Sequence, residues 1–144
     1  MIDVREAMEF AGGHIAGSLN VPLSRLAQAD LPQGALVLVC QSGNRSAKGV
    51  QVLLQRGHGQ PVRDLEGGIP SWQQAGLPPL LMSVNLSPVQ VRRAGIEQVV
   101  LDALADSGLA ADQLELELTE SMLIDDSDGL TQLLGRLRGR GVGI

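Results

Sequence analysis

The sequence predicts an α/β fold in which helices flank a parallel sheet. The clearest sign is the run ALVLVC at residues 35–40, which has the length and the unbroken apolar character of a buried strand. A polar loop follows, then residues 45–56 with apolar side chains at helical spacing, and another short strand is predicted at 61–65. Strand, helix and strand at this spacing are typical of parallel strands joined by a crossover helix.

The character of the sequence changes near residues 76–79, where Gly-Leu-Pro-Pro ends a short helix predicted around 70–74. Glycine and proline at this density punctuate a chain and end regular structure. We therefore predict two domains, over residues 1–78 and 79–144.

The second half repeats the order of strands and helices. Residues 81–86 form a candidate strand, 89–107 a helix, and 114–118 (LELEL) a strand with strict alternation of apolar and acidic residues. A further helix is predicted over 129–138, and residues 141–144 have the pattern of a beginning strand. These elements are too few to close a sheet or a barrel.

Composition favours a globular protein. Hydrophobic residues make up 44% of the chain, so a sizeable core can form, and the near absence of aromatic residues means that Leu, Val, Ile and Ala must build it. No apolar run reaches the length of a membrane span, and the N-terminus lacks a charged segment followed by an apolar one. We therefore expect a cytoplasmic protein without membrane contact.

Charge is divided unevenly between the two halves. Residues 1–78 carry six basic and six acidic side chains, whereas residues 79–144 carry five and ten, which accounts for the whole net charge of −5. Neither half has the basic face that binding to a phosphate backbone requires. We expect no nucleic-acid partner.

Cys40 is the single cysteine, which excludes an internal disulfide and a metal site built from several cysteines. Two interpretations remain, a buried inert thiol or a reactive one. Cys40 ends a predicted strand and precedes a helix, so its sulfur should lie near the unpaired N–H groups of the helix N-terminus, which stabilise a thiolate. Arg45 adds a positive charge and a possible bidentate contact with an oxyanion. The loop between them favours the reactive thiol.

Seven short motifs follow one another along residues 2–78: Asp3-Val4-Arg5, Glu9-Phe10, residues 13–18 (GHIAGS), 20–23 (NVPL), 40–46 (CQSGNRS), 65–69 (LEGGI) and 72–78 (WQQAGLP). In these motifs and in their order, the sequence resembles the rhodanese homology domain. The resemblance implies a rhodanese-like parallel sheet and transfer of a sulfane sulfur from thiosulfate or a persulfide to a thiol or other thiophilic acceptor. Both partners would be small molecules, and no cofactor is expected.

The resemblance also suggests roles for the loop. Cys40 would be the nucleophile that carries the sulfur as a persulfide, and Arg45 would bind the oxyanion of the donor. The backbone of Gln41, Ser42, Gly43 and Asn44 would cradle the anion. Related phosphatases have one more residue between cysteine and arginine, so the spacing here disfavours phosphatase activity. A non-catalytic binding or regulatory module of the same family is the alternative.

The second half contains three further motifs, at residues 84–87 (VNLS), 114–121 (LELELTES) and 137–144 (LRGRGVGI). In these stretches, residues 82–144 resemble an internal piece of an EAL domain, the family that hydrolyses cyclic di-GMP. By position Asn85 and Glu117 match two metal ligands of that family, and Glu120 matches a residue that supports a catalytic loop.

Other elements of the EAL family, including its naming motif and later acidic residues, have no counterpart here. We therefore expect residues 79–144 to be an incomplete (β/α)-barrel fragment that is inactive toward cyclic di-GMP. Its apolar helix faces would need other cover, so self-association through this segment is expected.

Overall fold

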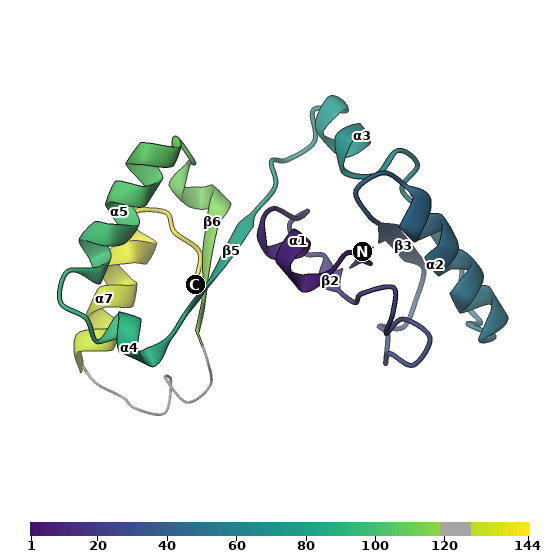
Figure 1. The fold of residues 1–144 in the computed structure, drawn as a ribbon, viewed down its shortest axis with the longest axis horizontal. Helices are drawn as coiled ribbons and strands as arrows, with labels where there is room; N and C mark the ends of the chain where they lie inside the picture. Colours follow the sequence, from purple (N-terminus) through teal and green to yellow (C-terminus); the bar gives the residue numbers. More distant parts are fainter. Residues whose placement is uncertain (119–127) are drawn as a thin grey trace. The chain divides into compact units, whose positions relative to one another are not determined.

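The computed structural model describes residues 1–118 and 128–144 (Figure 1). The chain divides into two compact units, Met1–Leu80 and Leu81–Ile144, and each is described by itself. Within the described residues, every helix is too short or too polar to cross a membrane.

The first unit is a four-stranded parallel sheet with helices around it. The strand order is β2-β1-β3-β4, so β3 lies inside the sheet with β1 on one side and β4 on the other. The predicted α/β fold with a parallel sheet and flanking helices is confirmed in this unit. Its elements are β1 (Ile2–Asp3), α1 (Ala7–Ala11), β2 (Leu19–Asn20), β3 (Leu36–Val39), α2 (Asn44–Gln55), β4 (Val62–Asp64) and α3 (Gly68–Gln74).

Side chains of β3 enter two apolar clusters on opposite faces of the sheet. Leu36 and Leu38 pack in a cluster that includes Leu53 of α2, whereas Val39 packs with Ile69 of α3. Successive side chains of a strand point to opposite faces, so a strand covered on both sides reads as a continuous apolar run. The burial of Leu36, Leu38 and Val39 on the two faces explains the apolar run from which β3 was predicted.

The second unit is built on two parallel strands, β5 and β6. Their register pairs Met82 with Leu114 and continues to Leu86 with Leu118, and an isolated parallel bridge joins Glu115 to Gly143. The elements are β5 (Met82–Leu86), α4 (Pro88–Val91), α5 (Ile96–Ser107), the 3-10 turn η1 (Ala111–Gln113), β6 (Leu114–Leu118) and α7 (Asp128–Gly139).

The prediction of one helix over residues 89–107 was wrong. The structure has two helices, α4 and α5, separated around Gly95. Gly95 adopts φ +84°, a left-handed conformation that a continuing right-handed helix cannot contain and that glycine adopts readily. The residues three and four positions before Ile96 are Arg93 and Arg92, so the apolar spacing of α5 does not extend back across the break.

The helices of the second unit lie on one side of the β5–β6 pair (Figure 1). Leu133 and Leu137 of α7 and Val100 of α5 pack with Leu116 of β6 in one apolar cluster. The leucine-rich face of α7 is therefore covered within the unit itself. Val99 of α5 is not covered in this way and is 58% exposed.

Candidate functional site

Cys40 follows the carboxyl end of β3, and its side chain is completely buried. Three groups converge on its sulfur. The backbone N–H of Gly43 lies 3.2 Å from Sγ, the N–H of Ser46 3.3 Å, and the Ser46 hydroxyl oxygen 3.5 Å. The chain can surround the sulfur in this way because only four residues, 40–43, separate the end of β3 at Val39 from the start of α2 at Asn44.

This environment lowers the pKa of the Cys40 thiol below its ordinary value. Burial by itself raises that pKa, because a charged sulfur loses its hydration. Hydrogen bonds from the Ser46 hydroxyl and from the N–H groups of Ser46, Ser42 and Gly43 act in the opposite direction and prevail. The geometry therefore favours the thiolate, which is the nucleophilic form of cysteine.

Ser46 connects the sulfur to the rest of the loop. Its hydroxyl carries one hydrogen, which can be donated to the carbonyl oxygen of Gly43 at 2.9 Å or to the thiolate sulfur of Cys40 at 3.5 Å. The side chain is fully buried. This role of Ser46 was not predicted from the sequence. Its position in the first turn of the helix after the cysteine loop is the feature that could have indicated it.

Two glycines allow the cysteine loop and the loop before α3 to approach closely. Gly43 has φ +90°, and a Cβ there would lie 3.1 Å from the backbone nitrogen of Gly67. Gly68 has φ +64°, and a Cβ there would clash with the carbonyl oxygen of Cys40. That oxygen accepts the N–H of Ile69 at 3.1 Å. The Gly67-Gly68 pair of the LEGGI motif thus forms a wall of the cysteine site.

The remaining loop residues face outward. Gln41, Ser42 and Asn44 are exposed, whereas Gly43 is buried with the cysteine. Among residues 41–44, the N–H of Gly43 donates a hydrogen bond to Sγ, and the N–H of Ser42 also stabilises the thiolate. The structure therefore brings part of the predicted cradle onto the sulfur and adds Ser46 to it.

Arg45 forms a bidentate ion pair with Glu9 at the N-terminal end of α2. Its Nη1 lies 2.7 Å from Glu9 Oε2, and its Nη2 lies 2.7 Å from Glu9 Oε1. The hydrogen bond from Arg45 is the main reason why the pKa of Glu9 falls from 4.5 to about 2. Glu9 in turn raises the pKa of Arg45. Both side chains stay partly exposed, at 35% and 40%.

A buried ion pair holds the segment that carries Glu9. Arg5 Nη2 lies 2.7 Å from Asp3 Oδ2, and the same nitrogen donates to the carbonyl oxygen of Gly13 at 2.8 Å. Arg5 precedes α1 and Gly13 follows it, so this contact fixes both ends of the helix relative to β1. Glu9 is thereby directed toward Arg45, which lies 36 residues away in the sequence.

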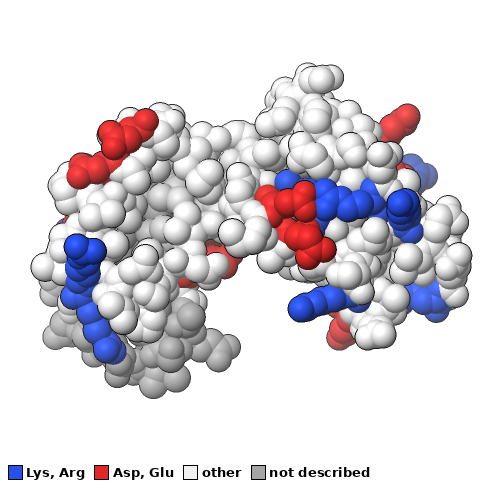
Figure 2. Space-filling view, in the orientation of Figure 1, with Lys and Arg blue, Asp and Glu red and all other residues white. Residues whose placement is uncertain are grey.

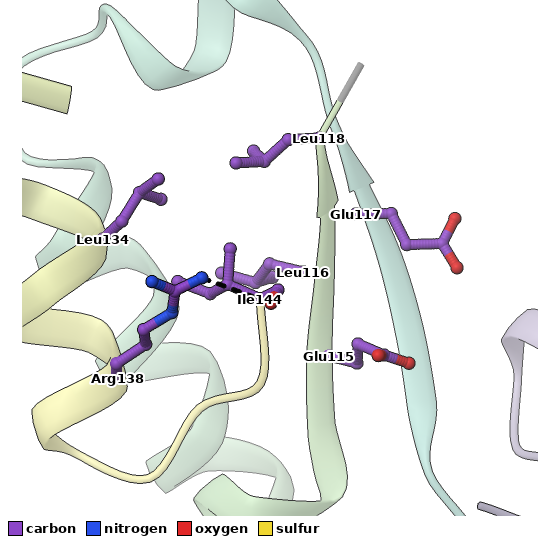
Figure 3. A pocket seen from close by; sticks show the side chains of 7 residues that line it. All are labelled: Glu115, Leu116, Glu117, Leu118, Leu134, Arg138 and Ile144. Carbon is purple, nitrogen blue, oxygen red and sulfur yellow. Dashed lines mark hydrogen bonds between the residues drawn. The ribbon is translucent and has the colours of Figure 1, made fainter. Parts of the chain in front are cut away.

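In the second unit, Asn85 and Glu117 are register partners on adjacent parallel strands, and both are exposed. Glu115 and Glu117 point away from α7, whereas Leu116 and Leu118 point toward a pocket of about 400 Å³ beside it (Figure 3). Within residues 1–118 and 128–144, no three His, Cys, Asp or Glu side chains lie close enough to hold a metal ion. Glu120 lies outside the described residues.

The sequence matches the family of the rhodanese-like domain over residues 1–75, which includes the whole cysteine site. The chain belongs to this family. The rhodanese-like domain thus accounts for the parallel sheet, the cysteine at the end of β3 and the loop before α2.

Several proteins are similar to this chain. The uncharacterized protein slr1261 of Synechocystis is 38% identical over 112 residues, which cover 76% of this chain and 60% of that protein. The chain therefore spans about three fifths of the length of that relative. The thiosulfate sulfurtransferase GlpE of Shewanella oneidensis is 35% identical over 79 residues, or 52% of this chain and 76% of GlpE. The chloroplastic thiosulfate sulfurtransferase 16 of Arabidopsis thaliana is 32% identical over 92 residues, or 54% and 76%.

Proposed function

We propose that the rhodanese-like domain is a sulfurtransferase in which Cys40 carries a sulfane sulfur as a persulfide. The observation that carries this proposal is the convergence of the Gly43 N–H, the Ser46 N–H and the Ser46 hydroxyl on the sulfur of Cys40. An inert core cysteine would not need these donors, whereas a thiolate and a persulfide anion do. Two relatives that are named thiosulfate sulfurtransferases support the same reaction class.

With thiosulfate as donor, the Cys40 thiolate attacks the outer sulfur. An S–S bond forms at Cys40, the bond between the two sulfur atoms of thiosulfate breaks, and sulfite leaves with the electron pair. An acceptor such as cyanide then takes the outer sulfur, forms thiocyanate and restores the thiolate. Charge and atoms balance in both steps, and neither step requires a cofactor.

The backbone donors around Cys40 would stabilise the anion in each resting state. The spacing of four residues between Cys40 and Arg45 supports sulfur rather than phosphate chemistry, in line with the resemblance.

Intact-mass spectrometry tests the proposal. Thiosulfate should add one sulfur atom to the full chain, and a reductant should remove it. Cys40→Ser should take up no sulfur and should produce no thiocyanate from thiosulfate and cyanide, because a hydroxyl cannot form a persulfide. Turnover in Cys40→Ser equal to that of the wild type would contradict the proposal.

A non-catalytic rhodanese-like module is the second candidate. The complete burial of Cys40 favours it, because a donor must reach a sulfur that has no exposed surface. The two candidates differ in one measurement. A binding module would keep an unmodified Cys40 after prolonged exposure to thiosulfate and to small persulfides, whereas the enzyme would gain sulfur.

For the second unit, we propose an EAL-like βα segment that does not hydrolyse cyclic di-GMP. Asn85 and Glu117 offer one amide and one carboxylate, whereas hydrolysis with two metal ions needs a larger set of carboxylates. The test is incubation of the full chain with cyclic di-GMP and Mg²⁺ or Mn²⁺. Hydrolysis that disappears in Glu117→Ala would contradict this proposal.

We also propose that this unit mediates self-association, through exposed apolar positions such as Val84 and Val99, which are 39% and 58% exposed. Sedimentation measured over a range of concentrations tests this. A chain that stays monomeric throughout would contradict it.

A further inference from the structure

The guanidinium group of Arg45, which was predicted to bind the oxyanion of the sulfur donor, is bound to the carboxylate of Glu9. Both terminal nitrogens of Arg45 are engaged, each with its own carboxylate oxygen at 2.7 Å. A bidentate contact of this geometry is the same one that a sulfonate or another oxyanion would make. The two terminal nitrogens of Arg45 that would bind an anionic donor therefore already bind the carboxylate of Glu9.

The charges at this position decide which donors are favoured. Arg45 and Glu9 together are neutral, so the approaching donor meets a compensated pair instead of a free cation. On the face drawn in Figure 2, acidic and basic side chains of the first unit lie beside one another. A dianion must displace Glu9 from Arg45 and then remain close to the released carboxylate, whereas a donor without net charge need not break the pair.

The carboxylate of Glu9 is held beside Arg45 by a second contact. Besides Arg45, its Oε2 accepts the backbone N–H of Glu6 at the start of α1, at 3.2 Å. The helix itself is fixed by the contact of Arg5 with Asp3 and Gly13. The carboxylate is thus part of a fixed structure and not a side chain that happens to reach a distant arginine.

We propose that Glu9 competes with the anionic group of the sulfur donor for Arg45, and thereby selects persulfides of low net charge over dianionic thiosulfate. This inference rests on the proposed sulfurtransferase reaction. It makes Glu9 a specificity-determining residue that acts through Arg45 and does not touch the transferred sulfur. With a persulfide donor, the Cys40 thiolate takes the outer sulfur and the donor leaves as a thiolate, so the balance of the step is unchanged.

The test compares two donors in the full chain. Thiosulfate is a dianion, whereas cysteamine persulfide carries an ammonium group that offsets its persulfide charge. Glu9→Gln should lower KM for thiosulfate by about two- to fivefold, as expected for losing one partly exposed ion pair. KM for cysteamine persulfide should change by less than about twofold, because this donor does not need Arg45 to be released.

Glu66→Gln is the matched control. Glu66 is exposed and precedes Gly67, which lies against the cysteine loop, so this variant removes one negative charge from the same region. It should leave the preference between the two donors unchanged. A second control combines Glu9→Gln with Arg45→Ala, where the effect of Glu9→Gln on KM for thiosulfate should vanish.

An unchanged or higher KM of Glu9→Gln for thiosulfate would overturn the inference, and so would an equal effect of Glu66→Gln. These outcomes differ from failure of the proposed function, in which the wild-type chain would take up sulfur from neither donor. Circular dichroism and thermal melting of Glu9→Gln show whether the variant keeps its fold. If α1 has melted, the more conservative Glu9→Asp, which shortens the reach to Arg45, should change KM in the same direction, and its failure to do so overturns the inference.

Discussion

Ser46 places two polar groups on the sulfur of Cys40, its backbone N–H at 3.3 Å and its hydroxyl oxygen at 3.5 Å. The backbone N–H is fixed by the first turn of α2 and stays in place when Ser46 is replaced by alanine. The hydroxyl can be removed, and it is also held by the carbonyl oxygen of Gly43 at 2.9 Å. The contribution of the side chain to the thiolate can therefore be measured separately from that of the helix.

We predict that Ser46→Ala raises the pKa of the Cys40 thiol, because it removes a hydrogen bond to the charged sulfur that is worth about 1.5 kcal/mol. The rate of alkylation by iodoacetamide, measured against pH, should shift its midpoint upward. Ser24→Ala, at an exposed serine of the same unit, should leave the midpoint unchanged. An unshifted profile in Ser46→Ala would show that the backbone donors alone hold the thiolate.

Much of the cysteine site could be predicted from sequence because its parts are local. Strand β3 is covered on both faces and reads as a continuous apolar run, and a helix follows at once, so the position of Cys40 at a helix N-terminus follows from six consecutive residues. The role of Gly68 was less visible. Sequence marks it as a turn residue, whereas its close approach to the carbonyl oxygen of Cys40 depends on how two loops meet.

The contact between Glu9 and Arg45 could not be predicted from the sequence. Glu9 and Arg45 lie 36 residues apart, and neither shows a pattern that points to the other. The break between α4 and α5 was also missed, although Gly95 lies in it and the preceding Arg92 and Arg93 are charged. The contact depends on how distant segments pack, and the break depends on the backbone conformation of Gly95. Side-chain periodicity reports neither.

Gly68→Ala should destabilise the protein more than Gly76→Ala. The two glycines have nearly equal φ, +64° and +65°, so a left-handed alanine costs about 1–2 kcal/mol at either position. At Gly76 a Cβ would meet open space, whereas at Gly68 it would clash with the carbonyl oxygen of Cys40. We expect the free energy of unfolding in urea to fall by about 2 kcal/mol or more in Gly68→Ala, and by about 1 kcal/mol in the control. Equal losses would mean that the cysteine loop moves aside at little cost.

The ion pair of Glu9 should persist in acid. Because the pKa of Glu9 is lowered to about 2, its stabilising effect is complete above the ordinary value of 4.5 and is lost as the pH falls toward 2. Both side chains are partly exposed, so we expect this effect to be small, about 0.2–1 kcal/mol. Titration of the Glu9 carboxyl carbon by NMR measures the pKa directly.

In Arg45→Ala this titration should return toward 4.5, since the first cause of the shift is removed. Arg25→Ala, which removes an exposed arginine elsewhere in the first unit, should leave it near 2. A carboxyl that titrates near 4.5 in the wild type would mean that the pair is not formed in solution, and would also remove the basis for competition at Arg45.

A chain that ends at Leu80 should keep the reactivity of Cys40. The groups around the sulfur come from Gly43 and Ser46, and the supporting loop from Gly68 and Ile69, all within the unit Met1–Leu80. Among residues 1–118 and 128–144, the two apolar clusters of this unit draw only on residues up to Leu80. The shortened chain should therefore gain one sulfur from thiosulfate, as seen by intact mass, and its Cys40→Ser variant should gain none. Limited proteolysis of the full chain should cut first near residues 79–81, where the two units join. If the shortened chain is unfolded while the full chain is compact and resists protease, the second unit contributes to the stability of the first, and sulfur transfer is then a property of the whole chain.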